Sequence, residues 1–284
     1  MIENAKYLSE KNIVDNREQL AILILKFAFA CLLVGRIWQH FFWTTPYGVF
    51  LPFLESETLK LVNYAFGSLL LLTLTIIPYY NPFKKWQFIL LLLAVLVLLL
   101  EAIAYWVTKS FRIVQLFEYS IQVSLPYFLH MLLRKDIDTK KILYAMRISI
   151  ALTFTAHGLY ALSFPYSTPA NFIEMTQNIL KVTPQQAILF LFVAGLLDLL
   201  LSIGLFFQKT AKASLVYAVI WGSLTALART VAYFDFLSPF TSLHRWMYET
   251  IHRVPHAALP LVLLILLGYL AIKKKAQDSV LVVE

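Results

Sequence analysis

The chain has 284 residues, of which 60% are hydrophobic and 14% are charged, and its formal net charge is +8. Charged residues make up about a quarter of a typical soluble domain, so this composition excludes an ordinary soluble protein. The lysines and arginines form no cluster of the kind that binds nucleic acid. The single cysteine, Cys31, excludes an internal disulfide and a dithiol redox centre.

Eight apolar stretches approach the roughly 20 residues that a helix needs to cross the hydrocarbon core of a bilayer. They predict an all-α integral membrane protein with eight transmembrane helices. Their bounds are 19–43, 61–79, 86–107, 113–133, 143–163, 187–207, 214–235 and 254–272. The remaining segments are a cytoplasmic N-terminal lead at 1–18, a cytoplasmic hinge at 134–142 and a cytoplasmic tail at 273–284.

The lysines and arginines outside the predicted spans indicate the orientation, because cytoplasmic loops are enriched in positive charge. Fourteen of them lie on the same side as the two termini, and six lie on the other side. The sequence therefore predicts a multi-pass protein of a bacterial-type cytoplasmic membrane with both termini in the cytoplasm.

The first half of the chain places polar residues toward the outer ends of its spans. The first span carries Arg36 and His40, and Thr45-Pro46 follows it. Proline is favoured at the first position of a helix, so we expect a short interfacial helix in this outer loop. The third span is apolar except for Glu101 and Tyr105 near its outer end. The fourth span is too polar to face lipid, because it contains Gln115, Glu118, Gln122 and His130.

The second half follows the same plan. The fifth span carries His157 in its outer third, and Thr168-Pro169 predicts another short helix in an outer loop. Residues 183–186 have the form of a capping box and predict the start of the sixth span, which contains Asp198 near its middle. The seventh span carries Arg229, and a polar, aromatic loop leads from it to the eighth.

The two halves match at several positions, which predicts an internal repeat of two four-span units, 19–133 and 143–272. The matching pairs are Lys26 with Arg147, Arg36 with His157, Thr45-Pro46 with Thr168-Pro169, and 117–119 with 248–250.

A four-span unit with an early arginine, and with His157-Gly158 before an outer loop that contains proline, resembles the DoxX-like superfamily of membrane proteins. Gly195 and Asp198 fit this resemblance, which is best over residues 143–235. A more distant similarity is to HTTM-type domains. Members of the DoxX-like superfamily include the small subunit of a thiosulfate:quinone oxidoreductase. The resemblance therefore implies a redox-associated component, with a quinone as the expected ligand and a redox protein as the expected partner.

The predicted topology brings ionisable residues together in the outer half of the membrane. Insertion scales assign a cost of about 2.5–3.5 kcal/mol to a charge at the centre of a helix, so charged residues on separate spans are expected to meet. We expect Arg36 to pair with Glu101 or Glu118, and Arg229 to pair with Glu249 or Asp198. The result is a polar pocket that opens outward. The candidate residues are Arg36, His40, Glu101, Asp198, Arg229 and Glu249 for substrate binding, and His157 and Glu118 for proton exchange.

Two interpretations of these residues remain open. In one, they are ion pairs that hold the helices together. In the other, they bind a substrate with a polar head and a lipophilic tail, such as a quinone. A weak metal candidate consists of Glu249, His252 and His256, whose spacing suits one helical face but whose helix is interrupted by Pro255.

Three functions are consistent with this sequence. The favoured one is a quinone-linked oxidoreductase component of DoxX-like type that works with a partner protein. The second is a transporter or lipophile-binding protein, since repeats around a polar site are common among transporters. The third is a non-catalytic assembly factor whose charges serve helix packing.

Overall fold

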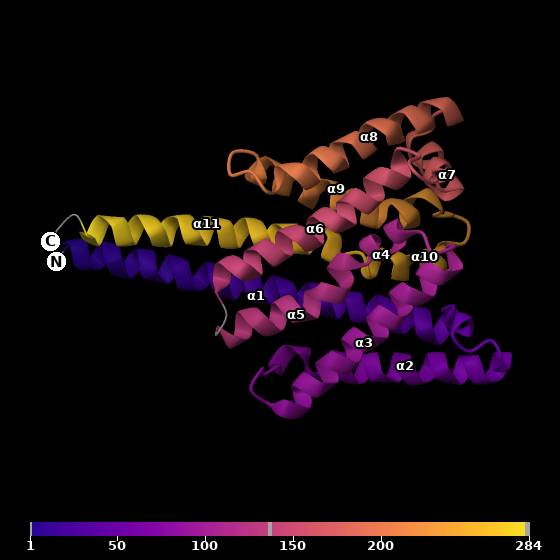
Figure 1. Ribbon diagram of the computed structural model, residues 1–284, viewed down its shortest axis with the longest axis horizontal. Helices are drawn as coiled ribbons and strands as arrows, with labels where there is room; N and C mark the ends of the chain where they lie inside the picture. Colours follow the sequence, from indigo (N-terminus) through magenta and orange to yellow (C-terminus); the bar gives the residue numbers. More distant parts are fainter. Residues whose placement is uncertain (1, 136–137, 282–284) are drawn as a thin grey trace.

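The computed structural model describes the backbone of residues 2–135 and 138–281, and the side chains of residues 16–135 and 138–268. Parts of the predicted lead, hinge and tail, namely residues 1, 136–137 and 282–284, lie outside the described residues. Within the described backbone every regular element is helical, as predicted (Figure 1). The elements are α1 (Ile2–Phe42), η1 (Tyr47–Val49), α2 (Ser56–Ile76), η2 (Ile77–Tyr79), α3 (Lys85–Thr108), α4 (Ile113–Glu118), α5 (Ser120–Arg134), α6 (Thr139–Ala161), α7 (Ala170–Leu180), α8 (Pro184–Gly204), α9 (Ala211–Ala232), α10 (Pro239–Ile251) and α11 (Pro255–Leu281).

Seven stretches of the described chain are helical, and long and apolar enough to cross a membrane. They are Asn16–Phe42, Ser56–Tyr79, Lys85–Thr108, Thr139–Ala161, Pro184–Gly204, Ala211–Ala232 and Pro239–Gly268. They coincide with seven of the eight predicted spans and give the chain the helices of a multi-pass, all-α membrane protein. The last stretch starts earlier than predicted, because the polar loop before the eighth span contains the helix α10.

The predicted fourth span, 113–133, is divided at Tyr119 into α4 and α5. The 15 residues of α5 extend about 22 Å, which is shorter than the roughly 30 Å hydrocarbon core. The hydroxyl of Thr153 on α6 lies in the break, where it accepts the N–H of Ile121 at 3.2 Å and donates to the carbonyl of Phe117 at 3.3 Å. In a continuous helix this N–H and this carbonyl would bond to each other. The inserted side chain therefore satisfies both groups and accounts for the break.

The predicted helix starts in the outer loops have mixed outcomes. The prediction at Thr45-Pro46 is wrong, because only the three residues of η1 follow and Thr45 instead donates its backbone N–H to Asn63. The prediction after Thr168-Pro169 is confirmed by α7, which begins at Ala170. The capping box is confirmed, because the Thr183 side chain accepts the Gln186 N–H and the Gln186 side chain accepts the Thr183 N–H at the start of α8.

The helices form an elongated bundle with two distinct ends (Figure 1). One end carries both chain termini together with the connections α2–α3, α5–α6 and α8–α9. The opposite end carries the short helices α4, α7 and α10. Helices α1 and α11 run side by side along the bundle and pack against each other. The short helices thus lie together at the end remote from the termini.

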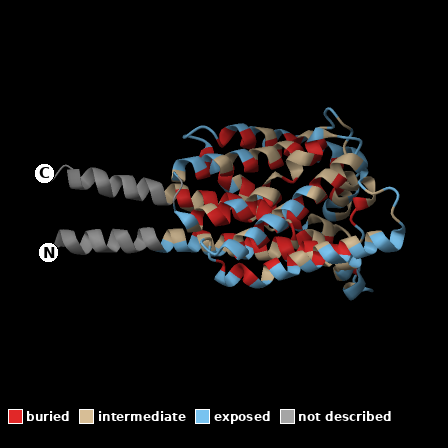
Figure 2. Ribbon diagram, turned by 60° about the horizontal axis from the view of Figure 1, so that its bottom comes forward, coloured by how far each residue is buried: buried red, intermediate tan, exposed pale blue. Residues whose placement is uncertain are grey.

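Glycines allow the helices to approach closely around the middle of the bundle. A Cβ atom on Gly158 of α6 would lie 2.9 Å from the Gly195 carbonyl oxygen of α8, so the two backbones are in contact. Gly35 of α1 and Gly222 of α9 approach the backbone of His252 and His256 in the same way, where a Cβ would lie 2.6 Å away. Buried residues lie inside the bundle and exposed ones cover its outside (Figure 2). The close contacts fix the junction of α10 and α11 between α1 and α9.

We expect Thr153→Val to destabilise the protein by about 1–3 kcal/mol, because the isosteric valine leaves the Ile121 N–H and the Phe117 carbonyl without a partner. Thermal unfolding in a mild detergent measures the change, and Thr75→Val on the exposed side of α2 is the matched control. An unfolding temperature equal to that of the wild type would show that the break in the helix does not depend on Thr153.

Candidate functional site

A cavity of about 990 Å³ lies toward the end of the bundle that carries α4, α7 and α10. Six of the eight candidate binding and proton-exchange residues line it, and His40 and Glu101 do not. Its polar lining includes Arg36, Gln39, Gln115, Glu118, His157, Asp198, Arg229, Glu249, His252 and Arg253. Its apolar lining comes mainly from α7, α8 and α9 and includes Phe172, Met175, Ile179, Phe190, Leu191, Trp221, Leu224, Leu227 and Val231. The cavity therefore has a charged wall and an apolar wall.

Arg36 joins three helices at the edge of the cavity. Its guanidinium group forms a buried ion pair with Glu101 of α3, as predicted, and donates to Gln122 of α5 at 2.5 Å and to Gln39 at 2.7 Å. The Tyr119 ring lies 5.2 Å from the guanidinium carbon, which suits a cation–π contact. Glu101 is completely buried behind Arg36. Arg36 thus faces the cavity, while Glu101 holds Arg36 in place.

His40 has a structural environment. Its Nδ1 lies 2.7 Å from the Arg36 carbonyl oxygen, which only accepts hydrogen bonds, so Nδ1 carries a proton. Its Nε2 lies 2.8 Å from the Tyr47 hydroxyl. Burial, and then the Glu101 carboxylate, raise the pKa of Tyr47, so the hydroxyl stays protonated and donates to Nε2. The prediction that His40 binds substrate is not supported, because both of its ring nitrogens have partners within the protein.

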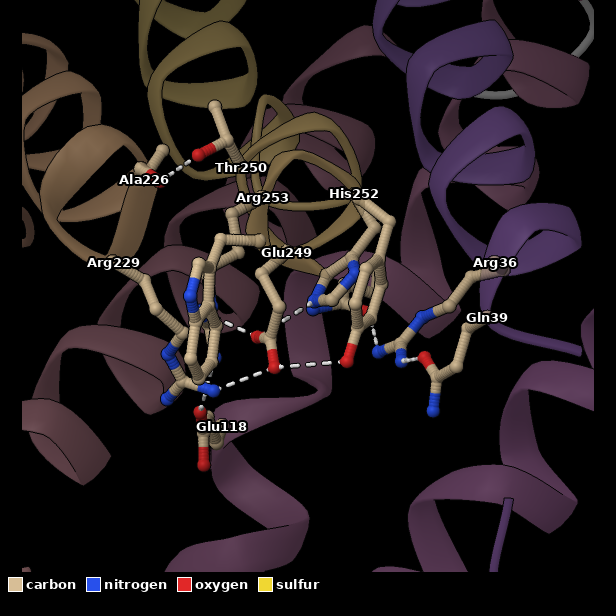
Figure 3. Close-up of polar contacts among 12 residues, drawn as sticks. Arg36, Gln39, Glu118, Ala226, Arg229, Glu249, Thr250, His252 and Arg253 are labelled. Carbon is tan, nitrogen blue, oxygen red and sulfur yellow. Dashed lines mark hydrogen bonds and ion pairs between the residues drawn. The ribbon is translucent and has the colours of Figure 1, made fainter. Parts of the chain in front are cut away.

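A second group of ion pairs runs across the charged wall (Figure 3). Glu249 of α10 accepts from Arg229 of α9 at 2.5 Å, as predicted, and from Arg253 at 2.9 Å. Arg253 also lies 3.9 Å from Glu118, the last residue of α4. Glu118 accepts a further hydrogen bond from Gln115 at 2.9 Å. These contacts connect α9, α10 and α4 in one network.

Arg253 is the main site residue that the sequence analysis missed. It stands four residues after Glu249 and pairs with it. That spacing was the available signal, since residues four apart are neighbours on a helical surface. Its second contact, with Glu118, is between residues 135 positions apart and gave no signal in the sequence.

His157 lies beside Glu118 at the edge of this network. Its Nε2 is 3.9 Å from the Glu118 carboxylate and has no hydrogen-bond partner. The His157 ring stacks on His256 with ring centroids 5.5 Å apart. The two predicted proton-exchange residues are therefore adjacent and both line the cavity.

The weak metal candidate does not form a cluster. His252 Nε2 is 4.0 Å from the Glu249 carboxylate, but His256 follows the break before Pro255 and stacks on His157 instead. Among the described residues, no group of three histidine, cysteine, aspartate or glutamate side chains is placed to hold a metal ion.

Asp198 lies apart from both groups of ion pairs. The indole N–H of Trp221 donates to its Oδ2 at 3.4 Å. The predicted alternative in which Asp198 pairs with Arg229 is not the one observed, because Arg229 pairs with Glu249. Asp198 still lines the cavity, together with Trp221 and Phe190.

Comparison of the chain with models of protein families, with curated proteins and with solved structures found no match. The resemblance to the DoxX-like superfamily therefore stays a prediction from the residues.

We expect Arg36→Ala to destabilise the protein by about 3–5 kcal/mol, because it leaves the carboxylate of Glu101 buried without a partner. The double variant Arg36→Met with Glu101→Gln removes both charges and should recover most of that loss. Unfolding of the two variants in detergent measures both effects. If the double variant is as unstable as Arg36→Ala, the ion pair is not the reason for the loss.

Proposed function

We propose that the protein is a membrane protein with eight spans that binds a lipophilic molecule with a polar head, of the quinone class, in a cavity on the outer side of the membrane. In this proposal it is a redox-associated component of DoxX-like type, and a partner protein supplies or accepts the electrons. The observation that carries the proposal is a single cavity that combines a charged wall with an apolar wall.

The arrangement of the helix connections supports the proposed topology. Both termini and three of the connections lie at one end of the bundle, so α4 and α5 together return the chain to that end (Figure 1). In this proposal α4 and α5 together form the fourth of the eight spans, although α5 alone is short. The excess of lysine and arginine on the side of the termini supports a cytoplasmic location for this end, and therefore an outer location for the cavity.

The order of the elements supports the proposed repeat. In each half a long helix is followed by an outer segment, two spans and a broken span: α1 with η1 in the first half, and α6 with α7 in the second. The broken spans are α4–α5 and α10–α11. Each has a glutamate in its outer helix, Glu118 and Glu249, and both glutamates belong to the same network.

The apolar wall suits a ligand that resides in the bilayer. Leu224, Leu227 and Val231 of α9 line the cavity and are also about half exposed at the surface of the bundle. Ile179 of α7 and Phe190 of α8 are exposed at the same opening. A surface of this kind on membrane-spanning helices faces lipid, so a lipophilic tail can extend from the cavity into the bilayer.

The charged wall suits a carbonyl or hydroxyl head group. Arg36, Arg229 and Arg253 line the cavity, and each has a carboxylate partner that holds its guanidinium group in a fixed position. His157 has a free Nε2 beside Glu118, so these two residues are placed to exchange a proton with the head group.

The same observations bear on the two other candidates. Transport across the membrane requires a path to the inner side, but an apolar core from α1, α5, α6 and α11, including Leu25, Leu129, Met146 and Leu263, fills the bundle there. The interpretation as an assembly factor is supported by the ion pairs, because every arginine in the network has a carboxylate partner and such pairs also hold helices together. Unfolding temperatures that do not respond to any quinone would support this last candidate.

We expect a decyl-tailed quinone to bind the protein in lipid nanodiscs and to quench its tryptophan fluorescence, since Trp221 lines the cavity. Arg229→Gln and His157→Gln should each weaken binding about tenfold or more, because each removes a hydrogen bond to the head group. The matched controls are Arg245→Gln and His244→Gln, whose side chains lie on the exposed side of α10 and do not line the cavity. Wild-type protein that does not bind the quinone, or binding that survives both cavity substitutions, would contradict the proposal.

We also expect Leu227→Trp to reduce binding of the decyl-tailed quinone by obstructing the opening between α7, α8 and α9. Ile220→Trp is the control, because Ile220 stands two helical turns away on the same helix, is exposed, and does not line this cavity. The same fluorescence titration measures both variants. Equal affinity of the two variants would show that the ligand does not use this opening.

A further inference from the structure

Asp198 is a buried carboxyl group whose hydrogen-bonding capacity is largely unused. The residue is 2% exposed in the middle of α8 and lines the cavity. Its Oδ1 has no hydrogen-bond partner, and its Oδ2 accepts from Trp221 at the long distance of 3.4 Å. The Tyr217 hydroxyl also approaches this carboxyl group. A carboxylate oxygen accepts more than one hydrogen bond, so the Asp198 side chain has unused capacity to accept a hydrogen bond from a further donor.

Asp198 differs in this respect from the other acidic residues of the site. Glu101, Glu118 and Glu249 each have an arginine within 4.0 Å. No ion pair to Asp198 is present among the described residues. Burying an acid in a membrane-spanning helix is unfavourable on insertion scales. Unlike these glutamates, Asp198 has no charged partner among the described residues to offset this cost, which leaves its Oδ1 for a partner outside the protein.

The position of Asp198 is fixed by the backbone contact between α6 and α8. A Cβ on Gly158 would lie 3.1 Å from the Asp198 Cβ, so the Asp198 Cβ packs directly against the backbone of α6. One turn along α8, the Ser202 hydroxyl donates to the Asp198 carbonyl and lies 3.1 Å from the Ala151 carbonyl, which fixes the backbone. The carboxyl group is thus held at the cavity between Trp221 and Phe190.

Asp198 and the charged wall lie near opposite ends of the face of α9 that lines the cavity. Trp221, Thr225 and Arg229 stand four residues apart on α9, and all three line the cavity. Trp221, which contacts Asp198, and Arg229, which belongs to the charged wall, are separated by eight residues, or about 12 Å along the helix. A ligand of about this length reaches both places at once.

We propose that Asp198 is a second recognition point of the cavity, which accepts a hydrogen bond from a donor group on the ligand, either a hydroxyl or a protonated amine. This inference rests on the proposed function, because it concerns the same cavity. It narrows the ligand to molecules with an acceptor group for the arginines and a donor group about 12 Å away along α9. The Trp221 ring lies beside the carboxyl group and can pack against either donor. Of the two, the protonated amine is favoured, because a cation is attracted to an aromatic ring.

Three ten-carbon acids test this inference, because they differ only at the end remote from the carboxylate. Decanoate has no donor there, 10-hydroxydecanoate has a hydroxyl, and 10-aminodecanoate has a protonated amine. Their affinities for the full chain in nanodiscs are measured by competition with the fluorescent titration of the decyl-tailed quinone, and by direct calorimetry. Each acid presents its carboxylate to the arginines of the charged wall.

We expect at least one of the two donor-bearing acids to bind the wild type roughly tenfold more tightly than decanoate, because its remote group gains a hydrogen bond to the Asp198 carboxyl group. In Asp198→Leu this order should reverse, because a polar group then enters an apolar pocket without a partner. Asp198→Asn distinguishes the two donors, since the amide still accepts from a hydroxyl but no longer attracts an ammonium group. Ser223→Ala on α9, whose hydroxyl donates to the Val219 carbonyl and which does not line the cavity, is the control and should keep the wild-type order.

The stability of the variants separates recognition from a structural role. Asp198→Leu removes a buried acid that has no ion pair among the described residues, so its unfolding temperature without ligand should equal or exceed that of the wild type. A strongly lowered unfolding temperature would assign Asp198 to packing and overturn the inference. Equal affinities of the three acids for the wild type would overturn the inference alone. Failure of all three acids and of the quinone to bind would overturn the proposed function as well.

Discussion

The buried ion pair between Arg36 and Glu101 is the interaction on which the arrangement of the polar residues depends. Neither charge is tolerated alone in the apolar interior, so α1 and α3 must meet where these residues stand. Gln122 brings α5 to the same place, because it accepts from the other nitrogen of the guanidinium group. The pair therefore determines where the first half of the chain contributes to the cavity and which side of Arg36 is left to face it.

The second half contributes through the junction of α10 and α11. Gly35 and Gly222 allow α1 and α9 to approach this junction closely enough for its side chains to enter the polar network. Glu249 then joins two arginines, and one of these reaches Glu118 in the first half. Because every arginine in the network is neutralised by a carboxylate, the network can line a membrane-embedded cavity at a tolerable cost.

The two interrupted segments, α4–α5 and α10–α11, each place a glutamate at the cavity, and the breaks have identifiable causes. At α4–α5 the Thr153 hydroxyl replaces a backbone hydrogen bond, and at α10–α11 the chain turns before Pro255. In an uninterrupted helix, the direction of the whole helix would fix the directions in which Glu118 and Glu249 point. The breaks instead orient the outer segments separately, so that both glutamates meet the arginines. Asp198, on the unbroken α8, remains outside this network.

The sequence by itself determined the helical class, seven of the membrane-spanning stretches and the capping box at Thr183. It limited the partner of Arg36 to Glu101 or Glu118 and the partner of Arg229 to Glu249 or Asp198, and the structure selected Glu101 and Glu249. The length of an apolar stretch and the capping of a helix depend on neighbouring residues, so they can be recognised from the chain alone. The cost of an unpaired charge in a membrane limits the possible partners to the few charged residues within the spans or at their ends. The tertiary structure decided the break at Tyr119, the inward position of Arg253 and the separation of His40 from the cavity. Each of these depends on a side chain from a distant segment or on the packing of another helix, and such a contact has no signature in the local sequence.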